Sequence, residues 1–329
     1  MASSSRKPTW SRRTRRVSAD DAALSPNEEN GLGIASVFCY EGAPMLEPVS
    51  VHRVPSTDGV ELAVYDFGGE GPDLIAGHAT GFHGRVYDPM LVQLDGFRRI
   101  SVDLRGHGDA TAPDGLDYRW ESCAEDLVAV IDALELGSER PLFGFGHSMG
   151  AASLLMIAPE RPDLFAGLVC YEPVIYPPGV TDDDARLGVW VERTRRRRRR
   201  FASHEAAVAN YAEKVPYSLL DPEALEVYVR HGFARSADGA VEIKCHPDVE
   251  AQLYLMGPHH RAWDGLQQVA CPVTLMRGSV LIPGPAYWAE AIVSELPNVL
   301  FLEIEGLGHL GPLEDPEQMA ALVASALAA

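Results

Sequence analysis

A serine flanked by two glycines restricts the fold of this chain more strongly than any other stretch. It lies in Gly146-His147-Ser148-Met149-Gly150, after a short apolar run and before a run of small and apolar residues. This context predicts a strand, a sharp turn and a helix, with Ser148 in strained backbone at the turn. Side chains in place of the glycines would collide with neighbouring segments, and the turn would raise the Ser148 hydroxyl above a sheet. A glycine-rich turn with an ordinary helix-capping serine is the alternative interpretation.

Short apolar segments alternate with helical patterns along most of the chain. The expected strands are residues 49–54, 60–67, 73–79, 98–104, 142–147, 168–171, 272–277 and 299–304, and the first two form a hairpin. Helical patterns cover residues 86–94, 120–136, the segment from the serine to 158, and 316–328. This alternation predicts an α/β fold, a parallel sheet with helices on both faces. Ligands bind such sheets beyond the carboxyl ends of the strands.

The 329 residues allow one large domain with an insertion, or two domains. Residues 1–45 are expected to form a disordered tail, and residues 46–176 and 263–329 the two parts of a core. Residues 177–262 lack the strand rhythm, contain helical patterns at 189–213 and 222–233, and predict an inserted helical cap without a buried strand. The arginine pairs near the N-terminus precede no apolar stretch, which argues against export, although an organellar transit peptide remains an alternative.

Composition narrows the possible partners. The formal net charge of −19 argues against nucleic acid, and no apolar stretch approaches the ~20 residues of a membrane helix. Five scattered cysteines without a C-x-x-C pair are typical of free thiols in a reducing compartment, so we expect a cytoplasmic protein. The sequence predicts no metal and no cofactor, and it carries no signal for the oligomeric state.

A serine hydroxyl needs a base within hydrogen-bond reach, and His309 is the candidate. It lies in Gly306-Leu307-Gly308-His309, after the last expected strand and before the last helix. A nucleophile followed along the chain by a histidine is the order expected for this architecture. Most of the 11 histidines are better interpreted as ordinary loop or core residues.

Four motifs together resemble those of the α/β-hydrolase fold superfamily, in particular its cap-containing serine hydrolases of the esterase and lipase type. They are residues 77–81, which resemble the oxyanion loop, 103–108, a turn after a strand, 146–150, the serine turn, and 306–309, the histidine loop. The resemblance covers about residues 49–176 and 263–329. It implies a mostly parallel eight-stranded sheet and an oxyanion hole formed by the backbone N–H groups of Thr80 and Met149. It implies structural roles for His78 and Asp103.

The acid that would orient His309 departs from the commonest pattern of the family. Relatives usually carry an aspartate after the strand that follows the cap, where this chain reads Met276-Arg277-Gly278-Ser279. Some members carry the acid after the preceding core strand, where this chain has Glu172. We therefore expect Glu172 to accept a hydrogen bond from the Nδ1–H group of His309, which fixes the tautomer and stabilises the imidazolium. A purely structural glutamate is the alternative, and it would leave the histidine without an acid.

Several further residues have weaker signals. Phe82, Tyr176 and His259 are expected to line the substrate pocket. The pair His259-His260 lacks further ligands at metal-binding spacing. The arginine run 195–200 is typical of a solvated helix face, with an anion or partner site as the alternative.

The residues together predict a serine hydrolase of a small or medium carboxylic ester. Ser148 would form an acyl-enzyme, with His309 as the base and Glu172 as the acid. The same residues could catalyse lactone opening, C–C bond hydrolysis or cofactor-free perhydrolysis. A non-catalytic ligand-binding protein on the same fold is the second alternative, suggested by the missing carboxylate after Gly278.

Overall fold

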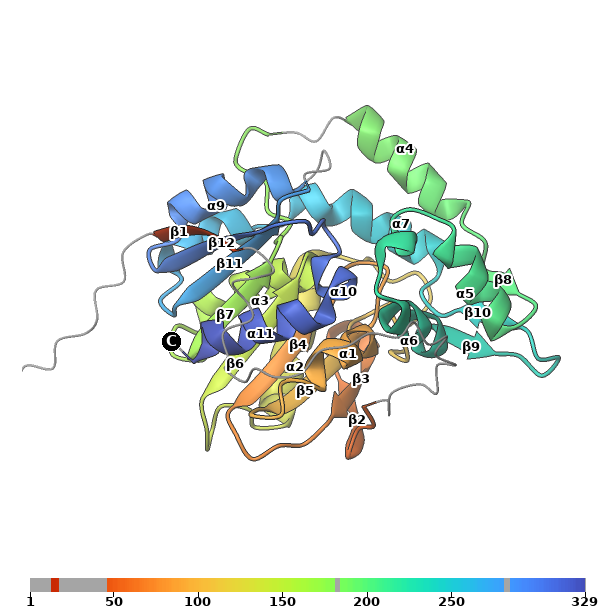
Figure 1. Ribbon diagram of the computed structural model, residues 1–329, viewed down its shortest axis with the longest axis horizontal. Coiled ribbons are helices and arrows are strands. Elements are labelled where there is room, and N and C mark those ends of the chain that lie inside the picture. Colours follow the sequence, from red (N-terminus) through yellow and green to blue (C-terminus); the bar gives the residue numbers. More distant parts are fainter. Residues whose placement is uncertain (1–12, 18–45, 181–183, 281–284, 329) are drawn as a thin grey trace, which may run out of the picture.

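A nine-stranded sheet runs through the computed structural model, which describes residues 13–17, 46–180, 184–280 and 285–328 (Figure 1). The strand order is β1-β12-β11-β7-β6-β4-β5-β3-β2. The strands are β1 (Arg13–Val17), β2 (Ser50–Pro55), β3 (Glu61–Asp66), β4 (Asp73–Gly77), β5 (Arg98–Asp103), β6 (Leu142–His147), β7 (Gly167–Tyr171), β11 (Val273–Gly278) and β12 (Val299–Ile304). In this sheet the pairing of β3 with β2 and β5 is antiparallel and every other pairing is parallel. The hairpin of β2 with β3 and the mostly parallel sheet are as the sequence predicts.

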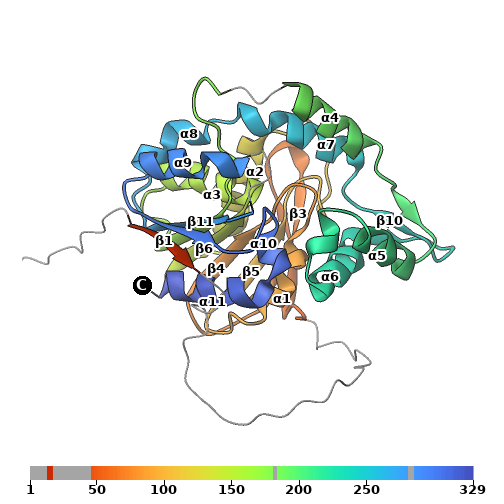
Figure 2. The same cartoon turned by 45° about the horizontal axis from the view of Figure 1, so that its top comes forward.

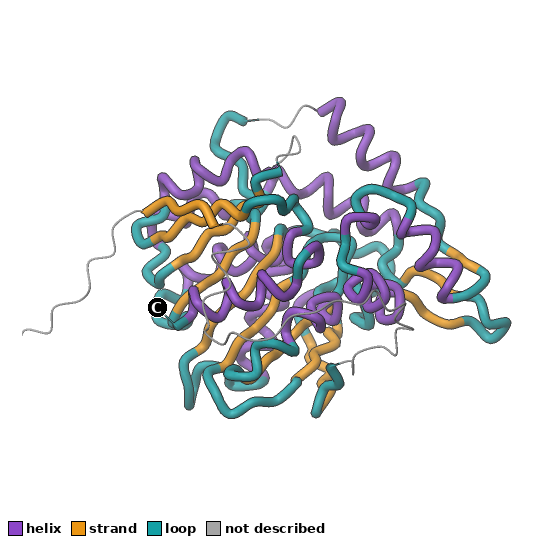
Figure 3. The backbone as a smooth tube through the Cα atoms, in the orientation of Figure 1, coloured by secondary structure: helices purple, strands orange, loops and turns teal. Residues whose placement is uncertain are grey.

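Helices cover both faces of the sheet, as Figure 2 and the tube in Figure 3 show. The core helices are α1 (Asp88–Leu91), α2 (Trp120–Ala133), α3 (Met149–Glu160), α8 (Ala262–Gly265), α9 (Ala289–Glu295), α10 (Gly311–Glu314) and α11 (Pro316–Leu327). One apolar cluster joins α2, α3, α8 and α9 to the sheet, and a second joins α1 and α11 to its other face. The central strands β4 and β7 are fully buried because both clusters contact them, which explains why they read as short apolar runs.

The ninth strand comes from the segment that we expected to be a disordered tail. β1 pairs in parallel with β12, from Arg13 beside Leu300 to Val17 beside Ile304, and adds to the eight strands of residues 46–329. Val17 is buried in the second cluster. The sequence misses this strand because four of its five residues are polar, and backbone pairing with an open sheet edge leaves no hydrophobic pattern. The remainder of residues 1–45 lies outside the described residues.

The insertion between β7 and β11 contains helices and a small second sheet. Its elements are α4 (Asp184–Arg195), β8 (Arg200–Phe201), α5 (His204–Ala212), α6 (Pro222–Gly232), β9 (Phe233–Arg235), β10 (Val241–Ile243) and α7 (Pro247–Met256). The expectation of a cap without a buried strand is therefore wrong, since β8, β10 and β9 pair and bury Phe201, Val241 and Ile243. These strands have two or three residues, too short for an alternating pattern to register. The helix expected over residues 189–213 is divided by β8.

The candidate nucleophile, base, acid and first oxyanion donor all follow the carboxyl ends of strands. Thr80 follows β4, Ser148 follows β6, Glu172 follows β7, and His309 follows β12. The chain leaves β4 toward β5 on one side and enters β6 on the other, so the serine lies where the strand order reverses. Such a switch point is the usual ligand site of an open α/β sheet.

Candidate active site

Ser148 occupies a strained turn between β6 and α3. Its backbone has φ 55° and ψ −112°, in a region that residues other than glycine seldom adopt. The Ser148 N–H donates to Tyr171 O at 2.9 Å, which ties the turn to the neighbouring strand β7. The surrounding hydrogen bonds thus hold a conformation that would be unfavourable in isolation, as is common at functional sites.

The glycines on either side allow the close approach of α3 to the sheet. A Cβ on Gly146 would lie 2.5 Å from the Cα of Ala151, and one on Gly150 would lie 2.2 Å from the carbonyl carbon of Gly77. The Gly150 N–H donates to His78 O at 3.1 Å, so the helix start is bonded to the loop after β4. Both glycines are therefore required by packing, as the sequence predicts.

The structure brings Glu172 and His309 together from segments that are 137 residues apart. The ring nitrogen Nδ1 of His309 lies 2.7 Å from Glu172 Oε2. The Glu172 side chain is 1% exposed and that of His309 is 34% exposed. Because a carboxylate only accepts, the Nδ1–H group of His309 donates this hydrogen bond to Glu172, and the tautomer so selected leaves Nε2 as the nitrogen that can take up a proton.

The second oxygen of Glu172 is also bound. Oε1 accepts the Gly278 N–H at 2.9 Å, and the Glu172 N–H donates to Met276 O at 2.9 Å. Gly278 ends β11, the strand after which most relatives of the resembled family would carry their acid. The Glu172 side chain therefore extends from the end of β7 to the end of β11. The Glu172 backbone is left-handed, with φ 42°.

The loop that carries His309 is fixed by contacts with neighbouring elements. Tyr171 donates its hydroxyl proton to Gly308 O at 2.7 Å, and Glu314 Oε2 accepts the Gly308 N–H at 2.8 Å. Burial raises the pKa of Glu314. These two bonds hold Gly308, the residue directly before His309. The packing of β7 and α10 therefore helps to set the position of the His309 ring.

His147, one residue before the serine, links the two loops of the site. Its Nε2 donates to His309 O at 2.7 Å, and its Nδ1 accepts the hydroxyl proton of Tyr87 at 2.9 Å. Tyr87 in turn accepts the Ala79 N–H at 3.3 Å, in the loop that precedes Thr80. Burial and the proximity of His309 lower the pKa of His147 well below its ordinary value, so the ring stays neutral. The sequence analysis missed this residue.

Ser148 and His309 lie on adjacent loops, and the structure shows no hydrogen bond between these two described residues. The rings of His147 and His309 are 5.2 Å apart between centroids, which brings the candidate base next to the residue that precedes Ser148. Ser148 is 5% exposed. Bonds between a nucleophile and its base are often long without substrate and tighten when it binds.

The backbone N–H groups of Thr80 and Met149 are among those at this edge that have no acceptor within the described residues. Thr80 Oγ lies 3.4 Å from Met149 Sδ, so the two residues are in contact, and Met149 begins α3. A helix N-terminus and a second unpaired N–H favour a negatively charged oxygen between them.

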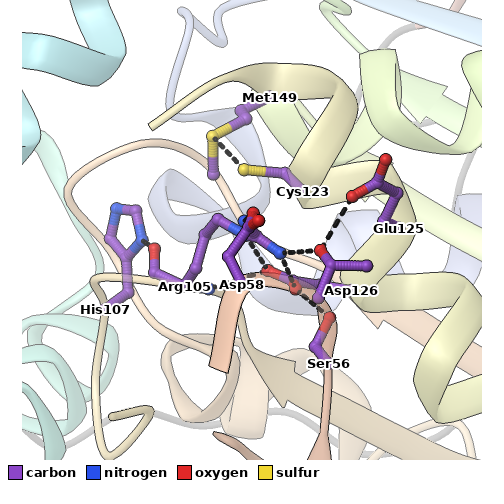
Figure 4. A network of polar contacts seen from close by, with 9 residues as sticks. Ser56, Asp58, Arg105, His107, Cys123, Glu125, Asp126 and Met149 are labelled. Carbon is purple, nitrogen blue, oxygen red and sulfur yellow. Dashed lines mark hydrogen bonds and ion pairs between the residues drawn. The ribbon is translucent and has the colours of Figure 1, made fainter. Parts of the chain in front are cut away.

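A buried ion pair between Arg105 and Asp126, drawn in Figure 4, is linked through His107 to the loop that carries Thr80. Arg105 donates from Nε to Asp126 Oδ2 at 2.9 Å and from Nη2 to Oδ1 at 2.7 Å, and both side chains are fully buried. Arg105 O accepts from His107 Nδ1 at 3.0 Å, and His107 Nε2 accepts the Gly81 N–H at 3.0 Å. Burial lowers the pKa of His107 well below its ordinary value, which preserves this acceptor.

His78 and Asp103 make the structural contacts that the resemblance implies. His78 Nε2 accepts the Leu104 N–H at 3.1 Å, and its Nδ1 donates to Ala79 O at 2.8 Å. Asp103 accepts the N–H groups of Gly84 and Asp109, each at 2.7 Å. All these bonds join loops at the carboxyl edge of the sheet.

The three expected pocket residues lie in different surroundings. Phe82 is buried and packs against Tyr228 of α6, with ring centroids 5.2 Å apart. Tyr176 is partly buried against the first apolar cluster. His259 is exposed at the end of a short helix, and its pocket role stays a prediction.

The described part of the chain contains no group of three histidine, cysteine, aspartate or glutamate side chains that could hold a metal ion. None of its helices combines the length and the apolar character needed to cross a membrane.

Known proteins resemble this chain over most of its length. The model of the alpha/beta hydrolase family matches residues 74–322. Lipase LipV of Mycobacterium tuberculosis is 26% identical over 283 residues, which cover 82% of this chain and 98% of the lipase. 2-(Acetamidomethylene)succinate hydrolase of Mesorhizobium japonicum is 31% identical over 105 residues, only 32% of this chain and 36% of that enzyme. A crystal structure of E-2-(acetamidomethylene)succinate hydrolase superposes with a TM-score of 0.72 at 22% identity, covering 85% of this chain and 99% of that one.

Proposed function

The chain belongs to the alpha/beta hydrolase family, and we propose that it is a serine hydrolase of small or medium carboxylic esters. Ser148 is the nucleophile, His309 the general base and Glu172 the acid. Relatives named as a lipase and as a hydrolase of a small molecule agree with a hydrolase enzyme. The substrate is a small molecule that reaches the carboxyl edge of the sheet beneath the inserted segment.

The reaction follows from the positions of the donors and acceptors. His309 Nε2 takes the hydroxyl proton as Ser148 Oγ attacks the ester carbonyl, and Glu172 stabilises the resulting imidazolium. The N–H groups of Thr80 and Met149 donate to the oxyanion, a contribution of about 3 kcal/mol per donor. The imidazolium protonates the leaving alcohol. Water then attacks the acyl-enzyme with His309 again as base, which releases the acid and restores Ser148.

The observation that carries this proposal is the 2.7 Å contact between His309 Nδ1 and Glu172 Oε2. It supplies the carboxylate whose absence after Gly278 had suggested a non-catalytic binding protein. It also fixes the tautomer in which Nε2 is free to accept a proton. A binding protein would have no need for an imidazole oriented by a buried carboxylate beside N–H groups that lack an acceptor.

A fluorophosphonate probe tests the proposal directly. We expect the wild type to be labelled at Ser148 at neutral pH, Ser148→Ala to lose the label, and Glu172→Gln to react more slowly. An unlabelled wild type that remains folded would contradict the proposal and favour the binding protein. For substrate class, turnover of short p-nitrophenyl esters is compared with that of lactones, a dienone acid and perhydrolysis of acetate. We expect the short esters to give the highest kcat/KM.

A further inference from the structure

One arginine of the run 195–200 is largely withdrawn from solvent, unlike its neighbours. The side chain of Arg197 is 11% exposed, whereas those of Arg195, Arg196, Arg199 and Arg200 are 42–82% exposed. The exposed arginines pair with carboxylates on the surface of the inserted segment. The expectation of a solvated face therefore holds for these four but not for Arg197.

Arg197 is surrounded by a carboxylate and aromatic rings. It forms an ion pair with Glu250, whose side chain is 4% exposed, and donates to the hydroxyls of Tyr211 and Tyr228. Its guanidinium lies 5.6 Å from the ring centroids of Tyr211 and Tyr217. A carboxylate this deeply buried is strongly unfavourable unless a cation neutralises it.

Glu250 lies against the loop that carries the proposed oxyanion donor. A Cβ on Gly81 would lie only 2.5 Å from Glu250 Oε1, so no side chain separates the carboxylate from this backbone. The hydroxyl of Tyr254, one helical turn along α7, lies 3.5 Å from both Glu250 Oε1 and Thr80 O. The Glu250 carboxylate thus lies against Gly81, the residue that directly follows Thr80.

A negative charge at this place would oppose the proposed reaction, which builds a second negative charge at the Thr80 N–H. We propose that Arg197 is an electrostatic positioning residue, which neutralises Glu250 so that the oxyanion can form beside it. The pair joins the inserted segment to the oxyanion loop without placing a net charge there. This inference rests on the proposed serine hydrolase function.

An asymmetry between the two partners distinguishes this role from simple packing. Arg197→Met leaves an unpaired carboxylate near the oxyanion, and we expect kcat for p-nitrophenyl acetate to fall about 10- to 100-fold with KM changed much less. Glu250→Gln removes the negative charge and keeps the cation, so we expect kcat within about threefold of the wild type. The double variant Arg197→Met, Glu250→Gln has no charge, and we expect it to regain most of the lost kcat.

Controls separate charge from folding. Arg199→Met removes an exposed arginine that pairs with Glu242 in the same segment, and it should leave kcat unchanged. Thermal unfolding and circular dichroism identify the folded variants. If Arg197→Met does not fold, Glu250→Gln still decides the question, because a folded Glu250→Gln with kcat reduced tenfold or more contradicts the inference.

The outcomes also separate this inference from the proposed function. Equal losses in the two single variants, without recovery in the double variant, would show a packing role and overturn the inference while the enzyme remains a serine hydrolase. A wild type without turnover and without fluorophosphonate labelling would overturn both.

Discussion

One carboxylate oxygen of Glu172 binds the His309 ring and the other accepts the Gly278 N–H. Replacing one oxygen by an NH₂ group should therefore change the hydrogen bond to the His309 ring while the side chain still fills the same space. Glu172→Gln keeps the shape but presents either a neutral oxygen or a competing donor to Nδ1. We expect kcat to fall about 10³- to 10⁴-fold, because the imidazolium loses its partner and the tautomer is no longer fixed. Ester turnover measures the effect, with Glu290→Gln as control because the Glu290 side chain is 74% exposed. Full activity of Glu172→Gln would assign Glu172 a structural role.

His147 should matter through the loops that it joins rather than through proton transfer. His147→Phe fills the same buried space but loses the bonds to His309 O and to Tyr87. We expect kcat to fall about tenfold with little change in KM, since ring position and not substrate contact is altered. Steady-state kinetics test this expectation, and an unchanged kcat would show that Tyr171 and Glu314 hold the histidine loop by themselves.

Two of the proposed catalytic residues, Ser148 and His309, could be selected from the sequence because glycines surround both. Glu172 could be selected because it follows β7, the strand beside one that lacks a carboxylate. The catalytic roles of all three stay predictions. His147 occupies a variable position of its motif, so nothing distinguished it before its partners were in place. The sequence gives no sign that Arg197 differs from the other arginines of the run 195–200. Its burial depends on how the inserted segment folds over the core, which a local pattern does not record.

The close contact between α3 and β4 depends on Gly150. Adding a methyl group at this position tests whether α3 can still pack against the sheet. Gly150→Ala would place a Cβ 2.2 Å from Gly77 C, where backbone and not a flexible side chain must move. We expect the free energy of unfolding to fall by about 2–4 kcal/mol and ester turnover to be lost with the serine turn. Urea unfolding followed by circular dichroism measures the change.

Gly188→Ala is the matched control for this substitution. Gly188 lies within α4, and nothing surrounds its Cβ position within 4 Å. Alanine is favoured over glycine in a helix, so the free energy of unfolding should rise by about 0.5–1 kcal/mol. If both variants lost similar stability, close approach would not explain the requirement for Gly150.

At the level of strands and helices, the sequence predicts the core and misses the additions to it. Buried strands such as β4 are apolar on both faces and therefore read clearly. β1 and the small sheet of β8, β9 and β10 are held by edge pairing and by a few buried rings, which a short sequence window does not register. The division of the inserted segment into a separate cap stays a prediction.

Over the whole molecule, buried neutral histidines should make stability depend on pH. Burial lowers the pKa of His78 from 6.5 to about 3, and burial also lowers the pKa values of His83, His107 and His147 well below 6.5. The unfolded chain binds protons at these rings below pH 6.5 and the folded chain does not, so acid favours unfolding. Each histidine should remove about 1.4 kcal/mol per pH unit between pH 6.5 and its folded pKa. Burial also raises the pKa of Asp88 to about 8, so this carboxyl offsets the effect of one histidine in this range. Urea unfolding at pH 7.5, 6.5 and 5.5 measures the net change, and a free energy of unfolding that does not fall with pH would contradict the neutral burial of these four histidines.

The most direct test of the proposed reaction is to locate the acyl group during turnover. The enzyme is mixed with p-nitrophenyl acetate, quenched in acid within the first turnovers and analysed by peptide mass spectrometry. We expect a burst of p-nitrophenol and an acetyl group on the peptide that contains Ser148, with both absent in Ser148→Ala. An acetyl group on another residue, or a burst that persists in Ser148→Ala, would contradict the assignment of Ser148 as the nucleophile.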